Sequence, residues 1–394
     1  MAIFNLSFSY LNFQEFKNDE VFKDNFIIKN IYPKKNYDII KIQHQNFTCF
    51  TKISKDLQAK PFDNISIYLI TKKVNFIDYI KGFYTNSFNL QILDNQIKNN
   101  SIKSNILYNI DEQHTSSEVS SLYQALFLAT SVPKELREVF SAYGISHLIA
   151  ISGFHLGVIS VVLYFILHFL YAPLHQRYIP YRNKRFDILI FVSIVLFIYL
   201  LLIDLAPSFL RSFVMFIVGI IFLRNNIKIL SFETLLVIVS MILALYPKLF
   251  FSLSLWFSVA GVFYIFLYLQ YFKNMNKYIS FVFFNFWIFL AINPIVHFIF
   301  YTTSIMQIFS PIFTILFTIF YPLELLLHIV GFGNMLDGVI EIMLNYEIGT
   351  YSKSISPYFF YTYVILSLCA IKSKRCFIVL NIFVGICSIY LFIV

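Results

Sequence analysis

The hydrophobic and polar positions change their period along the chain, and in the first part they alternate. In four short runs apolar residues recur at about every second position, which is typical of β-strands. Turn-like residues separate these runs. We therefore expect a small β-barrel over residues 1–75, because closure removes exposed strand edges. The runs are Phe26–Ile31, Tyr37–Gln43, Asn46–Ile53 and Ile65–Ile70.

After residue 75 the pattern becomes helical, and we assign residues 76–145 to a helical connector. Phe76–Gly82 predicts a short helix, and Ser117–Ala129 predicts a longer one with apolar residues on one face. Pro133 opens a third helix, which we expect to end near Tyr143.

From residue 146 to residue 394 the apolar runs are long enough to cross a membrane, since a spanning helix needs about 20 apolar residues. We expect a polytopic α-helical membrane protein with about eight to ten membrane segments, one of them broken or re-entrant near Pro311 and Pro322. Within 334–356, acidic residues interrupt the apolar pattern, which predicts an interfacial amphipathic helix. The predicted spans are 146–171, 186–204, 207–223, 231–246, 250–271, 279–301, 303–330, 357–371 and 376–394.

Composition supports the membrane assignment. Hydrophobic residues make up 58% of the 394 positions and charged residues only 13%, whereas a soluble protein has about 25% charged residues. A purely soluble enzyme and a disordered chain are therefore excluded. The four cysteines have neither zinc-binding nor redox spacing, so we expect no disulfide framework and no metal site. They are Cys49, Cys369, Cys376 and Cys387.

Basic loops account for part of the net charge of +9. Lysine and arginine gather in the cytoplasmic loops of membrane proteins. The basic loops at 172–185, 224–228 and 273–277 fall on one side of the predicted spans, which places the N-terminal β domain on the other side. The basic cluster at 372–375 breaks this pattern if 303–330 crosses once. A broken or re-entrant segment there would restore it.

The first predicted span contains polar residues that are costly in a bilayer. His147 and His155 fall on one face of a continuous helix, and ionisable residues at membrane depth usually face protein or water. Gly153 and Gly157 form a small-xxx-small pair, for which plain helix packing is the simpler explanation. Ser152 either bonds to a backbone carbonyl or faces a cavity. We take these residues as candidates for lining a path through the membrane.

A second polar segment joins the second and third predicted spans. Pro207 suits the first turn of a helix and Ser208 follows it, so Arg211 lies about one turn inside the third span. Arg211 is either a snorkelling side chain paired with Asp204 or a cation lining a path for an anion. The residues alone leave both readings open.

Two further polar positions join the candidate path. Asn293 precedes a proline in the sixth predicted span, and Gln307 opens the seventh. Broken helices at membrane depth are tolerated only against protein or a water-filled cavity. Glu324 and His328 are four residues apart and can pair.

In the β domain, Lys34, Lys35 and Lys41 lie near aromatic residues and form a candidate DNA-binding surface. An ordinary solvated loop is the simpler explanation for these lysines.

These segments resemble a known family. His147-Leu-Ile-Ala-Ile-Ser-Gly-Phe-His155 resembles the signature of the ComEC competence proteins, the inner-membrane channels for DNA in natural transformation. Pro207-Ser-Phe-Leu-Arg211 is similar to the family's second hallmark, and Asn293-Pro is similar to a weaker one. The order and spacing agree across roughly residues 118–394.

The resemblance implies translocation of single-stranded DNA across the bacterial inner (cytoplasmic) membrane, with an OB-like β domain on the periplasmic side. The partners it implies are single-stranded DNA, membrane lipid, a periplasmic DNA-binding competence protein, and a cytoplasmic ATP-driven helicase or single-stranded-DNA-binding protein, with a homodimer as one arrangement. The sequence has no GxxxxGK[ST] motif, so we expect no nucleotide cofactor.

The chain departs from the family in two respects. Many members carry a C-terminal metallo-β-lactamase-like domain, and typical members begin with membrane spans before the β domain. This sequence matches neither feature, so we expect a short form that is not an enzyme.

Two other functions compete with DNA translocation. A secondary transporter of a small anionic or lipid-like substrate would use Asp204, Arg211 and Glu324 as a coupled ion pathway. A non-conducting membrane anchor of a DNA-uptake complex would need no path at all. The transporter hypothesis leaves the β domain and the first-span signature unexplained.

Overall fold

The chain forms two compact units, which we describe separately. The β unit is Met1–Ser104 with Val239–Leu255, and the helical unit is Asn105–Ile238 with Trp256–Val394. The computed structural model describes residues 2–34, 37–44, 46–57, 63–92, 102–225 and 231–393.

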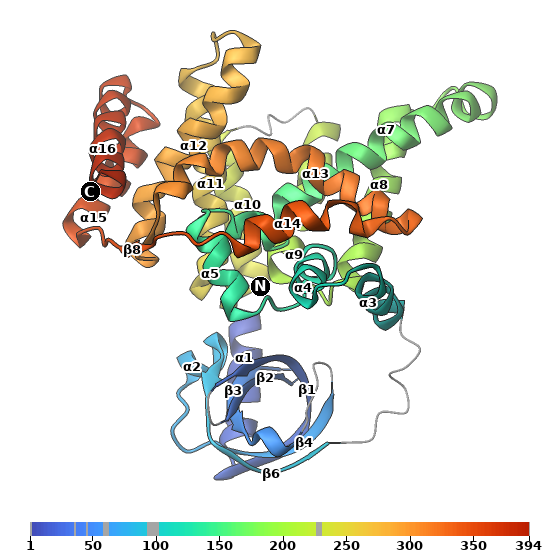
Figure 1. Cartoon of the computed structure of the whole chain (residues 1–394), viewed down its shortest axis with the longest axis vertical. Coiled ribbons are helices and arrows are strands. Elements are labelled where there is room, and N and C mark those ends of the chain that lie inside the picture. Colours follow the sequence, from blue (N-terminus) through green and yellow to red (C-terminus); the bar gives the residue numbers. More distant parts are fainter. Residues whose placement is uncertain are drawn as a thin grey trace. The chain divides into compact units, whose positions relative to one another are not determined.

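A curved, mixed sheet dominates the β unit (Figure 1). The described strands are β1 (Val21–Pro33), β2 (Asp38–Gln43), β3 (Thr48–Ile53), β4 (Asn64–Ile70), β5 (Phe83–Tyr84) and β6 (Ser87–Ile92). The first four confirm the alternating runs, and the order across the sheet is β5-β3-β2-β1-β4-β6. Among the described strands, β5 pairs with β3 and β6 with β4, so they end the ladder. The expected closed barrel is therefore not confirmed.

The inner face of the sheet forms the core of the β unit. Ile28 and Ile42 are fully buried there, as their alternation with exposed positions predicts. Helices α1 (Ala2–Lys17) and α2 (Phe76–Lys81) add aromatic side chains to this core, with the rings of Phe16 and Tyr79 5.5 Å apart. Cys49 on β3 is also fully buried, and this burial raises the pKa of its thiol.

The rest of the chain is almost entirely helical, and every predicted membrane span overlaps a helix. The short helices α3 (Ile102–Gln113), α4 (Ser117–Leu128), α5 (Lys134–Ala142) and α6 (Ser146–Ile149) come first. The apolar helices are α7 (Gly153–Tyr178), α8 (Lys184–Leu202), α9 (Pro207–Arg224), α10 (Phe232–Leu245), α11 (Leu253–Tyr271), α12 (Lys277–Ile299), α13 (Ser310–Val330), α15 (Pro357–Ala370) and α16 (Lys374–Phe392). The amphipathic helix α14 (Asp337–Asn345) lies between α13 and α15.

Six described helical segments are long and apolar enough to cross a membrane. Helices α10 and α15 are apolar but shorter. The chain is therefore a multi-pass membrane protein, and its described residues include six full-length candidate spans, where eight to ten membrane segments were expected. The six segments are α7, α8, α11, α12, Ile305–Val330 and α16.

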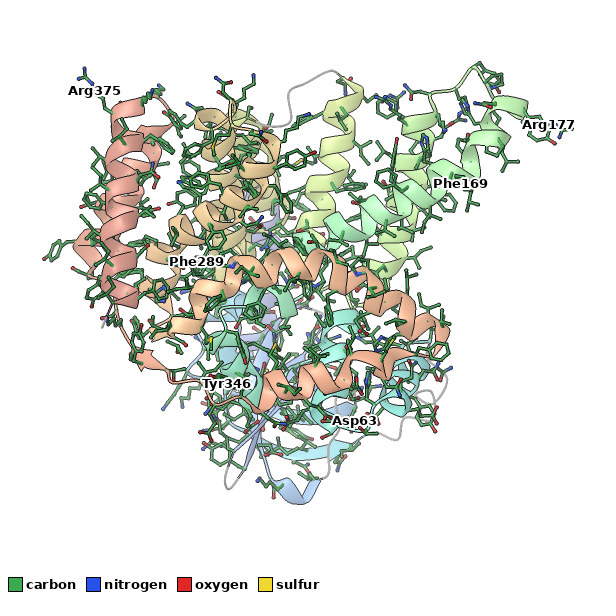
Figure 2. The ribbon with its side chains drawn as sticks, turned by 45° about the horizontal axis from the view of Figure 1, so that its top comes forward. Asp63, Phe169, Arg177, Phe289, Tyr346 and Arg375 are labelled. Atoms are coloured by element: carbon green, nitrogen blue, oxygen red, sulfur yellow. The ribbon has the colours of Figure 1, made fainter. Side chains whose placement is uncertain are left out.

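The segment that carries α13 and α14 returns to its starting point. It begins at β7 (Thr302–Thr303) and ends at β8 (Tyr351–Ser352), and these two strands pair antiparallel. Helix α13 runs crosswise to α12 and α16 (Figures 1 and 2). The two ends of the segment therefore lie side by side, an arrangement that fits the re-entrant segment suggested by the basic loops.

The break predicted at Pro322 was wrong, whereas the predicted region 303–330 does change from a 3-10 helix to an α-helix next to Pro311. Helix α13 continues through Pro322, while the 3-10 helix η4 (Ile305–Phe309) precedes it and Pro311 lies in its first turn. A proline inside a helix is tolerated at membrane depth where neighbouring groups bond to the freed backbone.

Within the helical unit, Arg177 and Arg375 lie at the same end, and Tyr346 lies toward the other end (Figure 2).

Helix α14 presents two apolar faces. Ile340 and Leu344 are buried in a core shared with α4, α5 and α13, whereas Val339 and Ile342 are 67% and 74% exposed. Exposed apolar side chains on a short helix of a membrane protein fit contact with lipid.

Candidate functional site at a broken helix

The first predicted span is broken into α6 and α7. The backbone is extended at Ala150 and at Ser152, and Ser152 is the N-cap of α7. Its hydroxyl accepts a hydrogen bond from the backbone N–H of Phe154 at 3.3 Å, and its own backbone N–H donates to Nδ1 of His155 at 3.2 Å. This reciprocal arrangement is a capping box, with histidine at the position where Glu or Gln is usual. A continuous helix over 146–171 was therefore a wrong prediction.

The break separates the two histidines. His155 is fully buried, and because its Nδ1 accepts a hydrogen bond, the neutral ring carries its proton on Nε2. The ring meets that of Tyr321 edge-on at 4.7 Å. His147 lies on α6 and is exposed, with Nε2 3.5 Å from the hydroxyl oxygen of Thr314. The shared face that we predicted for them does not exist.

The start of α9 packs directly against this break. The Ser208 hydroxyl donates a hydrogen bond to the carbonyl of Ile151. A Cβ atom on Gly153 would lie 2.8 Å from Oγ of Ser212, so only glycine fits there without a shift. A Cβ atom on Gly157 would meet nothing within 4 Å. Close packing therefore explains the first glycine of the pair but not the second.

We call this contact the motif junction, defined by Ile151–Gly153 and by Ser208, Arg211 and Ser212 on α9. Pro207 occupies the first turn of α9, as predicted, and Arg211 follows one turn later with only 5% exposure. The N-termini of α7 and α9 both carry the positive end of a helix dipole. The motif junction thus contains one guanidinium and two positive helix ends inside the helical unit, an environment that attracts anions.

The turn between α8 and α9 has an unusual backbone. Asp204 and Leu205 both have a φ of 53°. The left-handed region is tolerated by aspartate but costly for leucine, and such residues often occur at functional sites. Asp204 is exposed while Arg211 is buried.

Gly144, between α5 and α6, is hydrogen bonded to the start of α13, a role that was not predicted from the sequence. It has a φ of 71°, and its carbonyl accepts a hydrogen bond from the Ser310 hydroxyl at 2.9 Å. The Gln307 side chain donates to the carbonyls of Ser141 and Thr302 at 3.0 and 3.1 Å. The available signal was a glycine directly after the α5 pattern, which is typical of a helix end.

Asn293 is not part of the motif junction. It lies inside α12, which is an unbroken helix. Helix α12 continues through Pro294, so the interruption that we expected there was wrong. Asn293 is 4% exposed, and its carbonyl lies 3.2 Å from Nδ1 of His297 one turn later.

On the β unit, the outer face of the sheet carries two rows, each made of one lysine followed by two aromatic residues on neighbouring strands. One row runs from Lys41 to Phe50 and Tyr84, and its ammonium lies 5.8 Å from the centre of the Phe50 ring. The second row runs from Lys23 to Tyr68 and Phe88. There the ammonium is 5.0 Å from the Tyr68 ring, which stacks on Phe88 at 5.3 Å.

Only part of this face was predicted from the sequence. Lys34 is exposed in the turn after β1, and Lys35 lies outside the described residues. Lys23, Tyr68 and Phe88 were missed, because strand register decides which residues of separate runs become neighbours.

No metal centre accompanies these sites in the part of the chain that the structure describes, where no three His, Cys, Asp or Glu side chains are placed to hold an ion. A family model described as "Competence protein" matches residues 129–392. That range contains the whole motif junction. No curated protein and no solved structure matches the chain.

Proposed function

Because the chain belongs to the competence protein family, we propose that it carries single-stranded DNA across the inner membrane during natural transformation. The observation that carries the proposal is the motif junction. Two segments more than 50 residues apart meet there through the hydrogen bond from Ser208 to Ile151 and the close approach of Gly153 to Ser212.

The junction offers the electrostatics that a translocated strand requires. Each nucleotide brings one phosphate, and a conducting path needs cationic contacts that are favourable enough to enter but weak enough to leave. Arg211 supplies one fixed charge, and the N-termini of α7 and α9 add partial charges that cost no reorganisation. His147 is exposed on α6, just before the break, and adds a polar side chain to this segment.

We further propose that the β unit receives DNA on the periplasmic side. The two Lys–aromatic rows combine cations for phosphates with ring faces for bases, which is the pattern of single-strand binding surfaces. The proposal assigns no catalytic step to this chain. Energy then comes from a partner, such as an ATP-driven helicase or a single-strand-binding protein that captures DNA in the cytoplasm.

The test replaces Arg211 by Gln in a transformable host that lacks its own family member. With labelled DNA, we expect cytoplasmic entry to fall at least about tenfold, which corresponds to about 1.4 kcal/mol, while periplasmic uptake is unchanged. The matched control is Arg224→Gln, an exposed arginine at the other end of α9, which we expect to have no effect.

Arg211→Lys separates charge from shape and should restore most of the entry. Normal entry in Arg211→Gln at normal protein levels would remove the motif junction from the path. Loss of both periplasmic and cytoplasmic DNA would instead favour a non-conducting anchor of the uptake complex.

A further inference from the structure

A chain of four ionisable side chains, none of which belongs to the motif junction, is buried where the end of α3 meets α13 and the start of α14. Nδ1 of His114 lies 2.9 and 3.0 Å from the two carboxylate oxygens of Asp337. Nε2 of His114 lies 3.0 Å from Nε2 of His328. Nδ1 of His328 lies 2.7 Å from the carbonyl of Glu324 and 3.4 Å from its carboxylate. The last contact confirms the predicted Glu324–His328 pair.

Surrounding residues hold the two rings in this orientation. The Gln113 side chain donates to the carbonyl of His328 at 3.2 Å and accepts from the backbone N–H of Gly333 at 2.9 Å. A Cβ atom on Gly333 would lie 2.8 Å from Nε2 of His328, so the backbone of the 3-10 helix η5 (Gly333–Leu336) seals the pair. The Tyr123 ring stacks on His114 at 4.7 Å.

The orientation of each ring follows from its contacts. Turning either ring over would place carbon atoms where nitrogen now meets a polar partner, at both ends of His114 and at both ends of His328. The four ring nitrogens are therefore fixed.

Hydrogen-bond counting then fixes the protons. A carbonyl oxygen only accepts, so Nδ1 of His328 donates to Glu324, and Nδ1 of His114 faces Asp337 with one proton between them. With one proton on each Nδ1 side, the two Nε2 atoms would present lone pairs to each other at 3.0 Å. The contact therefore needs one further proton between them. If the proton between His114 and Asp337 moves from Nδ1 to the carboxylate, the number of protons bound by the whole chain of side chains stays the same.

We propose that the Asp337–His114–His328 chain is a buried proton-binding site, which holds the α13–α14 segment against α3 and α4 only while a proton is shared between the two Nε2 atoms. The proton is the ligand that fits this contact, since no three His, Cys, Asp or Glu side chains among the described residues are placed to hold a metal ion. The side chain of His114 is fully buried and that of Asp337 is 12% exposed, so the Asp337 end of the site is its more accessible end.

Both gain and loss of a proton break the contact. A second proton on the Nε2 pair turns two donors toward each other, whereas removal of the shared proton turns two acceptors toward each other. The other titratable groups that face the pair are the Glu324 carboxyl from α13 and the Tyr123 phenol from α4. Burial, and then the nearby Glu324, raise the pKa of Tyr123, which keeps it neutral. Asp111 on α3 is engaged instead by the Ser120 hydroxyl at 2.7 Å.

The direct test is NMR of the full-length chain in lipid, with histidine labelled by ¹⁵N in the rings. We expect scalar coupling across one N–H···N bond between two histidine Nε2 atoms. The coupling should be lost in His328→Gln and kept in His168→Gln, an exposed histidine on α7. Absence of the coupling in the unmodified chain at every pH would overturn the proposal.

A second readout is the unfolding temperature of the full-length chain in detergent as a function of pH. It should fall on both sides of an intermediate range, and this bell shape should flatten in His328→Gln but not in His168→Gln. Unfolding profiles of the same shape in the unmodified chain and in His328→Gln would contradict the proposed proton-binding site. If His328→Gln does not accumulate, the coupling in the unmodified chain decides alone.

Discussion

At the scale of single residues, Gly153 and Gly157 look equivalent in the sequence but not in the structure. Both belong to the same small-xxx-small pattern, yet only Gly153 has another helix within reach of a methyl group. The pattern reports which residues permit close approach, whereas the partner is fixed by tertiary packing. Sequence reasoning thus selected the correct segment but had no means to separate its two glycines.

Replacing Gly153 by Ala should destabilise the protein by about 1–3 kcal/mol, because the new methyl group meets Oγ of Ser212 at 2.8 Å. The double variant Gly153→Ala/Ser212→Ala should recover most of this loss, since Cβ of Ser212 lies at 3.4 Å, an ordinary contact. The measurement is thermal unfolding of the purified protein in detergent. Gly157→Ala is the matched control and should be near neutral. Equal effects of the two glycine variants would contradict the packing argument.

At the scale of elements, the apolar runs predicted where helices lie, because their length and hydropathy are local properties. The break at Ala150–Ser152 was not predicted, because a capping box with His155 in place of Glu or Gln does not match the usual pattern. Conversely, Pro322 suggested a break that α13 does not have. Local rules identify helices well, but tertiary partners decide whether a polar or proline residue interrupts them.

The sheet supports a prediction for DNA binding. Tyr68→Ala should weaken binding of single-stranded DNA to the full-length protein by about 1–3 kcal/mol, the usual contribution of one stacked base. Lys23→Ala should also weaken binding and should lower its salt dependence, because a phosphate contact is lost. Fluorescence anisotropy at several salt concentrations measures both effects.

Lys72→Ala is the matched control for this surface, since Lys72 is exposed but pairs with Glu20 at 3.1 Å. If all three variants bind DNA alike, the outer face of the sheet is not the binding surface. That outcome would leave the proposal for Arg211 untouched.

At the scale of the whole molecule, the pairing of β7 with β8 brings the two ends of the α13–α14 segment together. If 303–330, which is long enough to cross, makes a single crossing, the basic cluster at 372–375 falls on the side opposite to the other basic loops. The strand pair brings both ends of that region together, a contact between distant residues that no local pattern reports.

Membrane-impermeant maleimide labelling tests this topology. In a cysteine-free background, Arg177→Cys and Arg375→Cys should label from the same side of the membrane, because both lie at the same end of the helical unit (Figure 2). Tyr346→Cys lies toward the other end and should label from the opposite side. Labelling of Arg177→Cys and Arg375→Cys from opposite sides would mean that α13 crosses the membrane.

The strand pair also gives the α13–α14 segment the geometry of an insertion into the helix bundle. Paired antiparallel strands hold their Cα atoms about 5 Å apart, so a tight turn could join Thr302 to Ser352 directly. The aromatic core formed by α11, α12, α15 and α16 contains no buried residue from this insertion. The core of this bundle is therefore built independently of the insertion that carries His328 and Asp337, whose own buried residues pack with α4 and α5 instead.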